Sequence, residues 1–252
     1  MRRHKLGRQA KAIENRAANC MSLALITTAY ARQAEVPVVW QLANSEPIYS
    51  QEGSVVYISD HIQMRLYDAK LRADIMRVRF LAPSILLDYF SDRPAPRKRR
   101  LREHEMIALV YQNLGTEGIA DGRLAESFAL LVRGLEYDPF NPNLHNALAV
   151  LHRRVGANVA AESLYRFALA EFGDRVAVLN NYRKLLLSQQ RDAEARRLQA
   201  RLMRLPDPDP FPILGLGDRA AQQDRLDEAL AYYRKAADVA PYLPRVYSRI
   251  AR

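Results

Sequence analysis

The sequence predicts two folds in succession: a small α+β domain in the first hundred residues, followed by an all-α helical solenoid. In the second half, residues of the same kind recur at a step of 34 residues through four copies. In the first half, one strongly apolar helical segment precedes several short β-prone runs, which is the element order of an α+β domain. A basic segment containing prolines separates the two halves.

The composition is compatible with a packed core and with an anionic partner. Hydrophobic residues make up 49% of the chain, and the formal net charge is +10. This charge suits an acidic peptide, a nucleic acid or a membrane surface. The single cysteine excludes an internal disulfide, and the five histidines have no cysteine partners at zinc-ligand spacing, so we expect neither a metal nor a cofactor.

No apolar run approaches the roughly 18–20 residues that a membrane-spanning helix needs. The first residues are charged, but the apolar stretch after them ends in no convincing cleavage site for a signal peptide. As written, the chain is therefore expected to be cytoplasmic. A true start further upstream would instead favour the periplasm.

The first half begins with a predicted helix, Cys20–Glu35, which is apolar almost all round until Arg32 and is therefore expected to be buried on most sides. The stretch Ala43–Gly53 contains Pro47 and is predicted to be a mobile loop. Four β-prone runs are predicted to form a small antiparallel sheet. They are Pro37–Leu42, Ser54–Ser59, His61–Tyr67 and Asp74–Leu81.

Cys20 lies at the first turn of the predicted helix, where the positive end of the helix dipole stabilises a thiolate. A cysteine nucleophile also needs a base within hydrogen-bond reach, and His61 is the histidine inside the predicted core elements of this half. The alternative is structural, because free cysteine is among the most buried residue types and commonly packs as a small hydrophobe. Spacing alone leaves both interpretations open.

The segment NRAANCMSLALITTAYARQAEVPVVW resembles the nucleophile segment of transglutaminase-like, papain-related domains. Those domains have an Asn-Cys-x-Ser opening, a buried helix and then an Ala-Arg step towards the first strand. The segment SDHIQMRLYD resembles the strand that carries the catalytic histidine of that family. The resemblance implies a peptidase, amidase or acyltransferase in which Cys20 is the nucleophile and His61 the base.

The third catalytic residue departs from the family pattern. The family has an aspartate on the next strand, and Arg79 stands at that place here. Arginine cannot accept a proton from the imidazole and opposes an imidazolium. Because removal of the orienting carboxylate can lower triad turnover about 10⁴-fold, we expect impaired catalysis, with an active cysteine enzyme as the alternative. The domain is assigned to residues 1–90, with an N-terminus that is short for the family.

The junction, residues 91–105, is predicted to be a basic linker with two prolines. Its six basic residues within ten positions suit a nucleic-acid or acidic-partner patch, or alternatively a solvated connection. The solvated linker is the preferred interpretation, because no stacking aromatic residues interleave with these charges.

Four columns of residues in the second half keep the 34-residue step. They are Pro139, Gly173, Asp207 and Pro241; Ser127, Ala161, Ala195 and Ala229; Gly115, Ala149, Arg183 and Gly217; and Gly134, Ala168, Leu202 and Ala236. The pattern resembles the tetratricopeptide repeat (TPR), a 34-residue helix–turn–helix unit. The resemblance implies that residues 106–252 form about four repeats and a terminal helix. The third copy is degenerate, with Arg183 in a column of small residues.

Similar repeats bind segments of other proteins in the groove lined by the first helix of each copy. The predicted partner-binding residues lie at i, i+4 and i+7 on the first helices of the second and third copies. They are Asn146, Val150, Arg153, Asn180, Lys184 and Leu187. Amide side chains can bond a peptide backbone and the two cations favour an acidic ligand, although a solvated face is the alternative for each residue.

The preferred function is therefore that of a protein interaction scaffold. Its expected partners are proteins or peptides, with acidic ones favoured. Nucleic-acid binding through the basic junction is a weaker alternative, and the sequence does not determine the oligomeric state.

Overall fold

The computed structural model describes the backbone of residues 20–52, 55–68, 83–88, 97–202, 204–205, 210–241 and 243–251. These residues form two compact units, and the chain passes between them after Pro47, after Ser59 and after Val110. The first unit contains residues 20–47 and 60–110, and the second contains residues 48–59 and 111–251. Within these ranges, no helix is long and apolar enough to cross a membrane.

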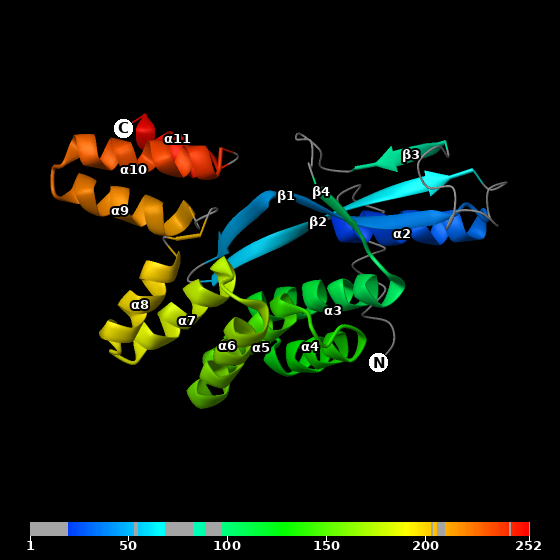
Figure 1. Cartoon of the computed structure of the whole chain (residues 1–252), viewed down its shortest axis with the longest axis horizontal. Helices are drawn as coiled ribbons and strands as arrows, with labels where there is room; N and C mark the ends of the chain where they lie inside the picture. The colour runs from blue at the N-terminus through cyan, green and yellow to red at the C-terminus, as the bar shows by residue number, and fades with distance from the viewer. Residues whose placement is uncertain are drawn as a thin grey trace. The chain divides into compact units, whose positions relative to one another are not determined.

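The first unit packs helix α2 (Cys20–Gln33) against a four-stranded sheet (Figure 1). The strand order is β3-β2-β1-β4, and the two outer pairs are antiparallel. The strands are β1 (Val38–Glu52), β2 (Val55–Tyr67), β3 (Ser84–Leu87) and β4 (Arg97–Arg100).

The core of this unit joins the helix to the sheet. Met21 and Ala24 of α2 are buried with Ile62 and Met64 of β2. Trp40 of β1 packs against the same cluster, and its indole Nε1 donates to Oγ1 of Thr28 at 2.9 Å. The apolar helix therefore provides the buried surface that the sequence predicts for it.

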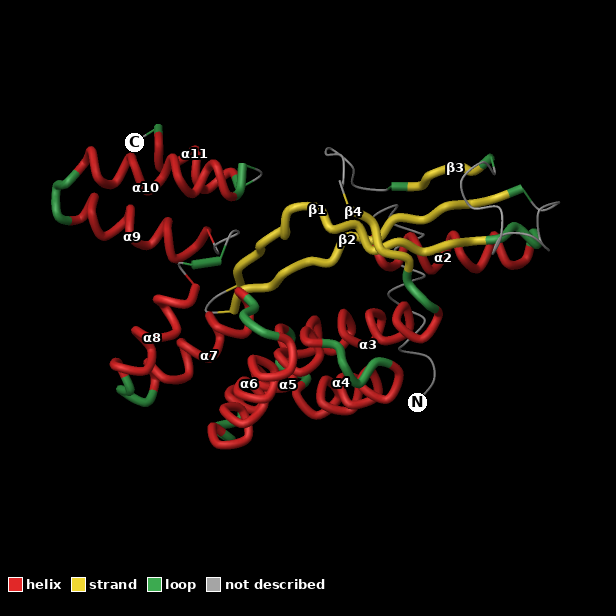
Figure 2. Tube along the Cα trace, in the orientation of Figure 1, coloured by secondary structure: helices red, strands yellow, loops and turns green. Residues whose placement is uncertain are grey.

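The prediction of a loop at Ala43–Gly53 was wrong for residues 43–52, because β1 continues through them to Glu52 (Figure 2). Strand pairing overrides the low β propensity of this polar segment. Pro47 lies beyond the stretch of β1 that pairs with β4, which ends at Asn44. A missing N–H therefore costs no hydrogen bond to β4. The predicted strand Asp74–Leu81, including Arg79, lies outside the described residues.

Part of the basic junction is a strand, although Arg99 and Arg100 are exposed to solvent as the linker interpretation expects. Arg97–Arg100 form β4, which pairs antiparallel with Gln41–Asn44. The buried Leu101 extends this pairing, since its backbone N–H donates to the carbonyl of Trp40 at 2.9 Å. Dense positive charge is common on edge strands because it prevents further strands from adding. The run Arg97–Arg100 has no alternation of apolar and polar residues, so the sequence did not predict this strand.

The second unit is a mostly helical, TPR-like array, as predicted (Figure 1). Its helices follow one another as antiparallel pairs, with α3 shared between the two units. They are α3 (Glu103–Ala120), α4 (Leu124–Tyr137), α5 (Pro142–Arg154), α6 (Asn158–Phe172), α7 (Val176–Ser188), α8 (Asp192–Leu202), α9 (Pro210–Gln222), α10 (Leu226–Val239) and α11 (Pro244–Ile250).

The columns of small residues lie where neighbouring helices approach most closely. All four members of the column that starts at Ser127 are buried. A Cβ atom on Gly115 would lie only 2.7 Å from the side chain of Leu131 on the paired helix. Arg183 interrupts its column but stays on α7, and its Nη2 donates to Oδ1 of Asn180 at 3.2 Å.

A further column with the same step forms the turn inside each repeat. Gly122, Gly156, Gln190 and Asp224 have positive φ angles of 77°, 77°, 60° and 59°. The left-handed conformation is costly for residues with a Cβ atom and easy for glycine. The turn geometry is therefore kept in the third and fourth copies although the glycine is not.

The buried side chains of the array form separate clusters. One cluster draws on α5, α6, α7 and α8, and includes Tyr165, Leu179 and Leu185. Another draws on α9, α10 and α11, and includes Ile213, Tyr233 and Val246. Each repeat thus packs against its neighbours in the chain, as in other repeat proteins, and the core consists of successive clusters.

Candidate partner-binding site

The six predicted partner-binding residues lie on two neighbouring helices, α5 and α7, which pack against each other. We call the surface that they outline the α5/α7 face. Val150 and Asn180 are buried, whereas Leu187 is 43% exposed. Asn146, Arg153 and Lys184 are half-buried. The structure therefore brings the two predicted triplets together, and their role in binding stays a prediction.

Asn181 was not among the predicted residues, yet it connects the two helices of this face. Its Nδ2 donates to Oδ1 of Asn146 at 3.2 Å, and the side chain is only 1% exposed. Its own Oδ1 is buried and accepts no hydrogen bond from any described residue. The signal in the sequence was the pair Asn180-Asn181 after the apolar first turn of α7, VAVL, because amides on a buried stretch of helix need hydrogen-bond partners.

Arg153 of α5 lies beside Tyr165 of α6, whose ring is fully buried and stacks on Tyr182 at 5.6 Å. Burial raises the pKa of the Tyr165 phenol, and the neighbouring Arg153 guanidinium opposes this rise. The Tyr165 hydroxyl and Nε of Arg153 bond to no other side chain in the described part of the chain, so the Arg153 side chain is the polar neighbour of this buried hydroxyl.

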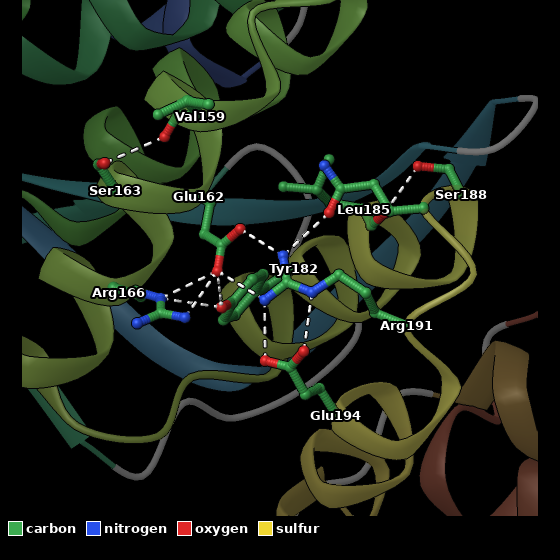
Figure 3. Close-up of polar contacts among 10 residues, drawn as sticks. Val159, Glu162, Ser163, Arg166, Tyr182, Leu185, Ser188, Arg191 and Glu194 are labelled. Carbon is green, nitrogen blue, oxygen red and sulfur yellow. Dashed lines mark hydrogen bonds and ion pairs between the residues drawn. The ribbon is translucent and has the colours of Figure 1, made fainter.

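A second polar cluster lies between α6 and α8 and centres on Glu162 (Figure 3). Its carboxylate accepts from Nη1 of Arg191 at 2.6 Å, from Nη2 of Arg166 at 2.7 Å and from the Tyr182 hydroxyl at 2.8 Å. Arg191 also donates to both oxygens of Glu194, at 2.7 and 2.8 Å. The hydrogen bonds from Arg191 lower the pKa of the Glu162 carboxyl to about 2.

The Glu162 cluster has the character of a structural joint. Glu162 and Arg166 belong to α6, the second helix of the second repeat. Tyr182 of α7, Glu194 of α8 and Arg191 in the turn between them belong to the third repeat. Charge-assisted hydrogen bonds of this kind are stronger than neutral ones, and they hold the degenerate third copy to the second. The cluster therefore stabilises the relative position of α6 and α7, on which the α5/α7 face depends.

The proposed catalytic pair falls on the expected elements of the first unit. Cys20 is the first residue of α2, and His61 lies in β2. The side chains of both residues lie outside the described ones, as does the whole of Arg79, so their geometry remains a prediction. No group of three histidine, cysteine, aspartate or glutamate side chains that could hold a metal occurs in the described ranges.

Comparison with known proteins relates the chain to pilus assembly proteins. No family model matches the sequence. Over 128 residues it is 31% identical to the type IV pilus assembly protein PilF of Pseudomonas aeruginosa, which covers 50% of this chain and 51% of the relative. The chain thus spans about half the length of this curated relative.

Two solved structures with the same repeat show a limited likeness. The structure of P. aeruginosa PilF is 26% identical, covers 60% of this chain and 68% of its own, and has a TM-score of 0.45. PilW, a type IV pilus biogenesis factor, is 23% identical and covers 58% of this chain and 68% of its own, with a TM-score of 0.41. The chain is a TPR-like protein by its repeat columns and helix pairs, and over 128 residues it is related in sequence to PilF. The transglutaminase-like resemblance of its first part rests on the sequence pattern alone.

Proposed function

We propose that the protein is an interaction scaffold whose repeat array binds extended segments of partner proteins on the α5/α7 face. The observation that carries this proposal is the Asn146–Asn181 contact, in which the buried Asn181 donates to Oδ1 of the half-buried Asn146 and fixes its amide. A held amide of this kind suits the backbone of a peptide that lies along the two helices.

A peptide-display selection on the full chain tests this function. Random 12-residue peptides, attached to their support through the C-terminus, are selected on the wild type, and the affinity of the best binders is then measured for variants. Asn181→Ala is expected to weaken binding about tenfold, because it removes a hydrogen-bonding amide. Asn158→Ala, at the start of α6, is the matched control and should bind normally. Equal affinity of both variants for every selected peptide contradicts the proposal.

The relation to PilF favours a more specific role, which we propose as the biological setting of the scaffold: a part in the assembly of type IV pili. The relation covers about half of that protein, so the proposal concerns the shared repeats. Deletion of the gene in its source organism should reduce surface pili counted by electron microscopy. Complementation with the wild type, but not with Asn181→Ala, should restore them, and unchanged pili after deletion contradict this role.

An enzymatic function of the first unit is the second candidate. It is favoured by the places of Cys20 at the start of a buried helix and His61 on a strand of the adjacent sheet, as the transglutaminase-like resemblance implies. In that case, His61→Ala should raise the thiol pKa obtained from the pH dependence of alkylation. A thiol pKa near the free value of roughly 8.5, unchanged by His61→Ala, contradicts the enzyme.

A further inference from the structure

Helix α4, the second helix of the first repeat, is apolar on two opposite sides. One side packs into the array and includes the buried Leu130 and Leu131. On the other side, Phe128 is 43% exposed and Val132 is 36% exposed. A helix that is apolar on all sides is normally covered on all sides. We call the exposed side the outer face of α4, and it consists of Ala125, Phe128, Ala129 and Val132.

The same positions of the other three repeats contain charged residues. At the step of 34 residues, Phe128 and Val132 correspond to Glu162 and Arg166 in the second repeat. The sets equivalent to the outer face are Val159, Glu162, Ser163 and Arg166; Ala193, Arg196, Arg197 and Ala200; and Asp227, Leu230, Ala231 and Arg234. Each of these sets contains two charged residues, whereas the outer face of α4 contains none. The repeat itself therefore does not require an apolar residue at these positions, and the first repeat needs a separate reason for them.

The charges beside the outer face have both signs. Glu126 and Arg133 are seven residues apart, so they lie on the same flank of α4. Their side chains are 46% and 52% exposed, and within one chain they pair with Arg123 and Glu136. Exposed ion pairs of this kind are weak, so both side chains can also pair with a partner. This flank accordingly offers an acid and a base to whatever covers the outer face.

A second copy of α4 fits this arrangement when the two helices are antiparallel. A twofold axis beside Leu130 places residues that are equally far before and after it opposite each other. Phe128 lies two residues before that axis and Val132 two residues after it, so each phenylalanine faces a valine of the other copy. Ala129, next to the axis, allows the helices to approach closely. The pairing of apolar residues is therefore complementary in size.

The flanking charges match in the same arrangement. Glu126 lies four residues before the axis and Arg133 three residues after it, so each acid lies near the base of the other copy. A membrane surface is a poorer occupant, because Glu126 and Glu136 beside the outer face oppose anionic lipids. The outer face contains no cation that could bind an acidic peptide. Charge and size together favour a second copy of this chain.

We propose that two copies of the protein associate through the outer faces of their α4 helices, which pack antiparallel. Burial of Phe128 and Val132 drives the association, and the two Glu126–Arg133 pairs fix its direction. The outer face lies on a second helix of a repeat, and the α5/α7 face lies on first helices. Dimerisation is therefore a property separate from the proposed binding of partner segments.

Sedimentation velocity of the full chain, from about 1 to 100 μM, tests the dimer. The wild type is expected to show an equilibrium between monomer and dimer. Phe128→Glu should raise the dimer Kd at least tenfold, because it places a charge at the centre of the interface. Phe140→Glu is the matched control, since Phe140 is 71% exposed in the turn after α4, and it should leave the Kd unchanged. A wild type that stays monomeric throughout, or equal dimer Kd values for the two variants, overturns the proposal.

Charge reversal tests the antiparallel pairing with variants that leave the core intact. Glu126→Arg and Arg133→Glu should each raise the dimer Kd about tenfold, because each places like charges opposite each other. The double variant Glu126→Arg/Arg133→Glu should dimerise like the wild type. An equimolar mixture of the two single variants should form mixed dimers more readily than either variant dimerises alone. A double variant as weak as the single ones, or a mixture without this gain, overturns the inference.

Discussion

Glu162 accepts hydrogen bonds from side chains on both sides of the junction between the second and third repeats. Glu162→Gln removes the negative charge that Arg191 and Arg166 share, and it should lower the free energy of unfolding by about 2 kcal/mol. Urea unfolding followed by circular dichroism measures this loss. Glu194→Gln is the control, because that side chain is 42% exposed, and it should cost less than about 1 kcal/mol. Equal losses for the two variants would show that Glu162 is an ordinary surface acid.

The lowered pKa of Glu162 gives this stabilisation a predictable pH dependence. The folded value of about 2 lies below the ordinary value of 4.5, so the carboxyl releases its proton more readily in the folded state. Its contribution is therefore fully present above pH 4.5, and it is lost as the pH falls through 2. The stability difference between the wild type and Glu162→Gln should shrink between pH 5 and pH 2, with the rest of the acid transition common to both proteins. A difference that stays constant over this interval contradicts the assignment.

Gln190 occupies the left-handed turn position that glycine fills in the first two repeats. In this conformation the Cβ clash costs residues other than glycine roughly 1–2 kcal/mol. Glycine has no such clash, but it loses more conformational entropy on folding than other residues. We therefore expect Gln190→Gly to raise the unfolding free energy by about 0.5–1 kcal/mol. Gly156→Ala, at the same turn of the second repeat, should have the opposite sign. Thermal unfolding of both variants measures the pair, and equal signs would contradict the turn argument.

Helix α9 contains two glycines that offer a matched test of helix packing. A Cβ atom on Gly217 would lie 2.6 Å from Cδ1 of Tyr233, whereas one on Gly215 would meet no atom within 4 Å. Gly217→Ala should thus destabilise the protein by about 1–3 kcal/mol through overpacking against α10. Gly215→Ala should stabilise it by up to about 1 kcal/mol, because alanine has the higher helix propensity. Chemical denaturation distinguishes them, and stabilisation by both would show that α9 and α10 are not closely packed.

At the scale of elements, the helices were predictable and the strands were only partly so. The 34-residue columns predicted the α-helical array because each column marks a contact between neighbouring helices, which sequence periodicity reports directly. The basic run at Arg97–Arg100 gave no such signal, since an edge strand is defined by its backbone partner on β1. Polar residues beyond Leu42 similarly hid the length of β1.

The candidate site was predictable in its location and not in its chemistry. Helical spacing placed Asn146 and Arg153 on one face, and the next repeat placed Asn180 beside them. The importance of Asn181 and Tyr165 depends on which polar atoms remain unpaired after packing. Whether a buried polar atom finds a hydrogen-bond partner depends on the residues that surround it in the folded protein, so a periodic sequence pattern cannot predict it.

At the scale of the whole molecule, each compact unit has a hydrophobic core of its own. The core of the first unit contains Ile62, and the chain's one tryptophan, Trp40, packs against it. Most helices belong to the second unit, whose core around α6 and α7 contains Leu185. Because the first unit's cluster differs from those of the second unit, we predict two unfolding transitions, one reported by tryptophan fluorescence and the other by circular dichroism at helical wavelengths.

Two core substitutions identify which transition belongs to which unit. Ile62→Ala should shift the fluorescence transition to lower urea concentration, and Leu185→Ala should shift the circular dichroism transition, each by the equivalent of about 2–5 kcal/mol. Both residues are fully buried, so the two changes are matched in kind. Each variant should leave the other signal almost unchanged, because its cavity lies in the other core. Helix α3 and strands β1 and β2 each contribute residues to both units. Coincident transitions that move together in both variants would show that these shared elements join the units into one cooperative fold.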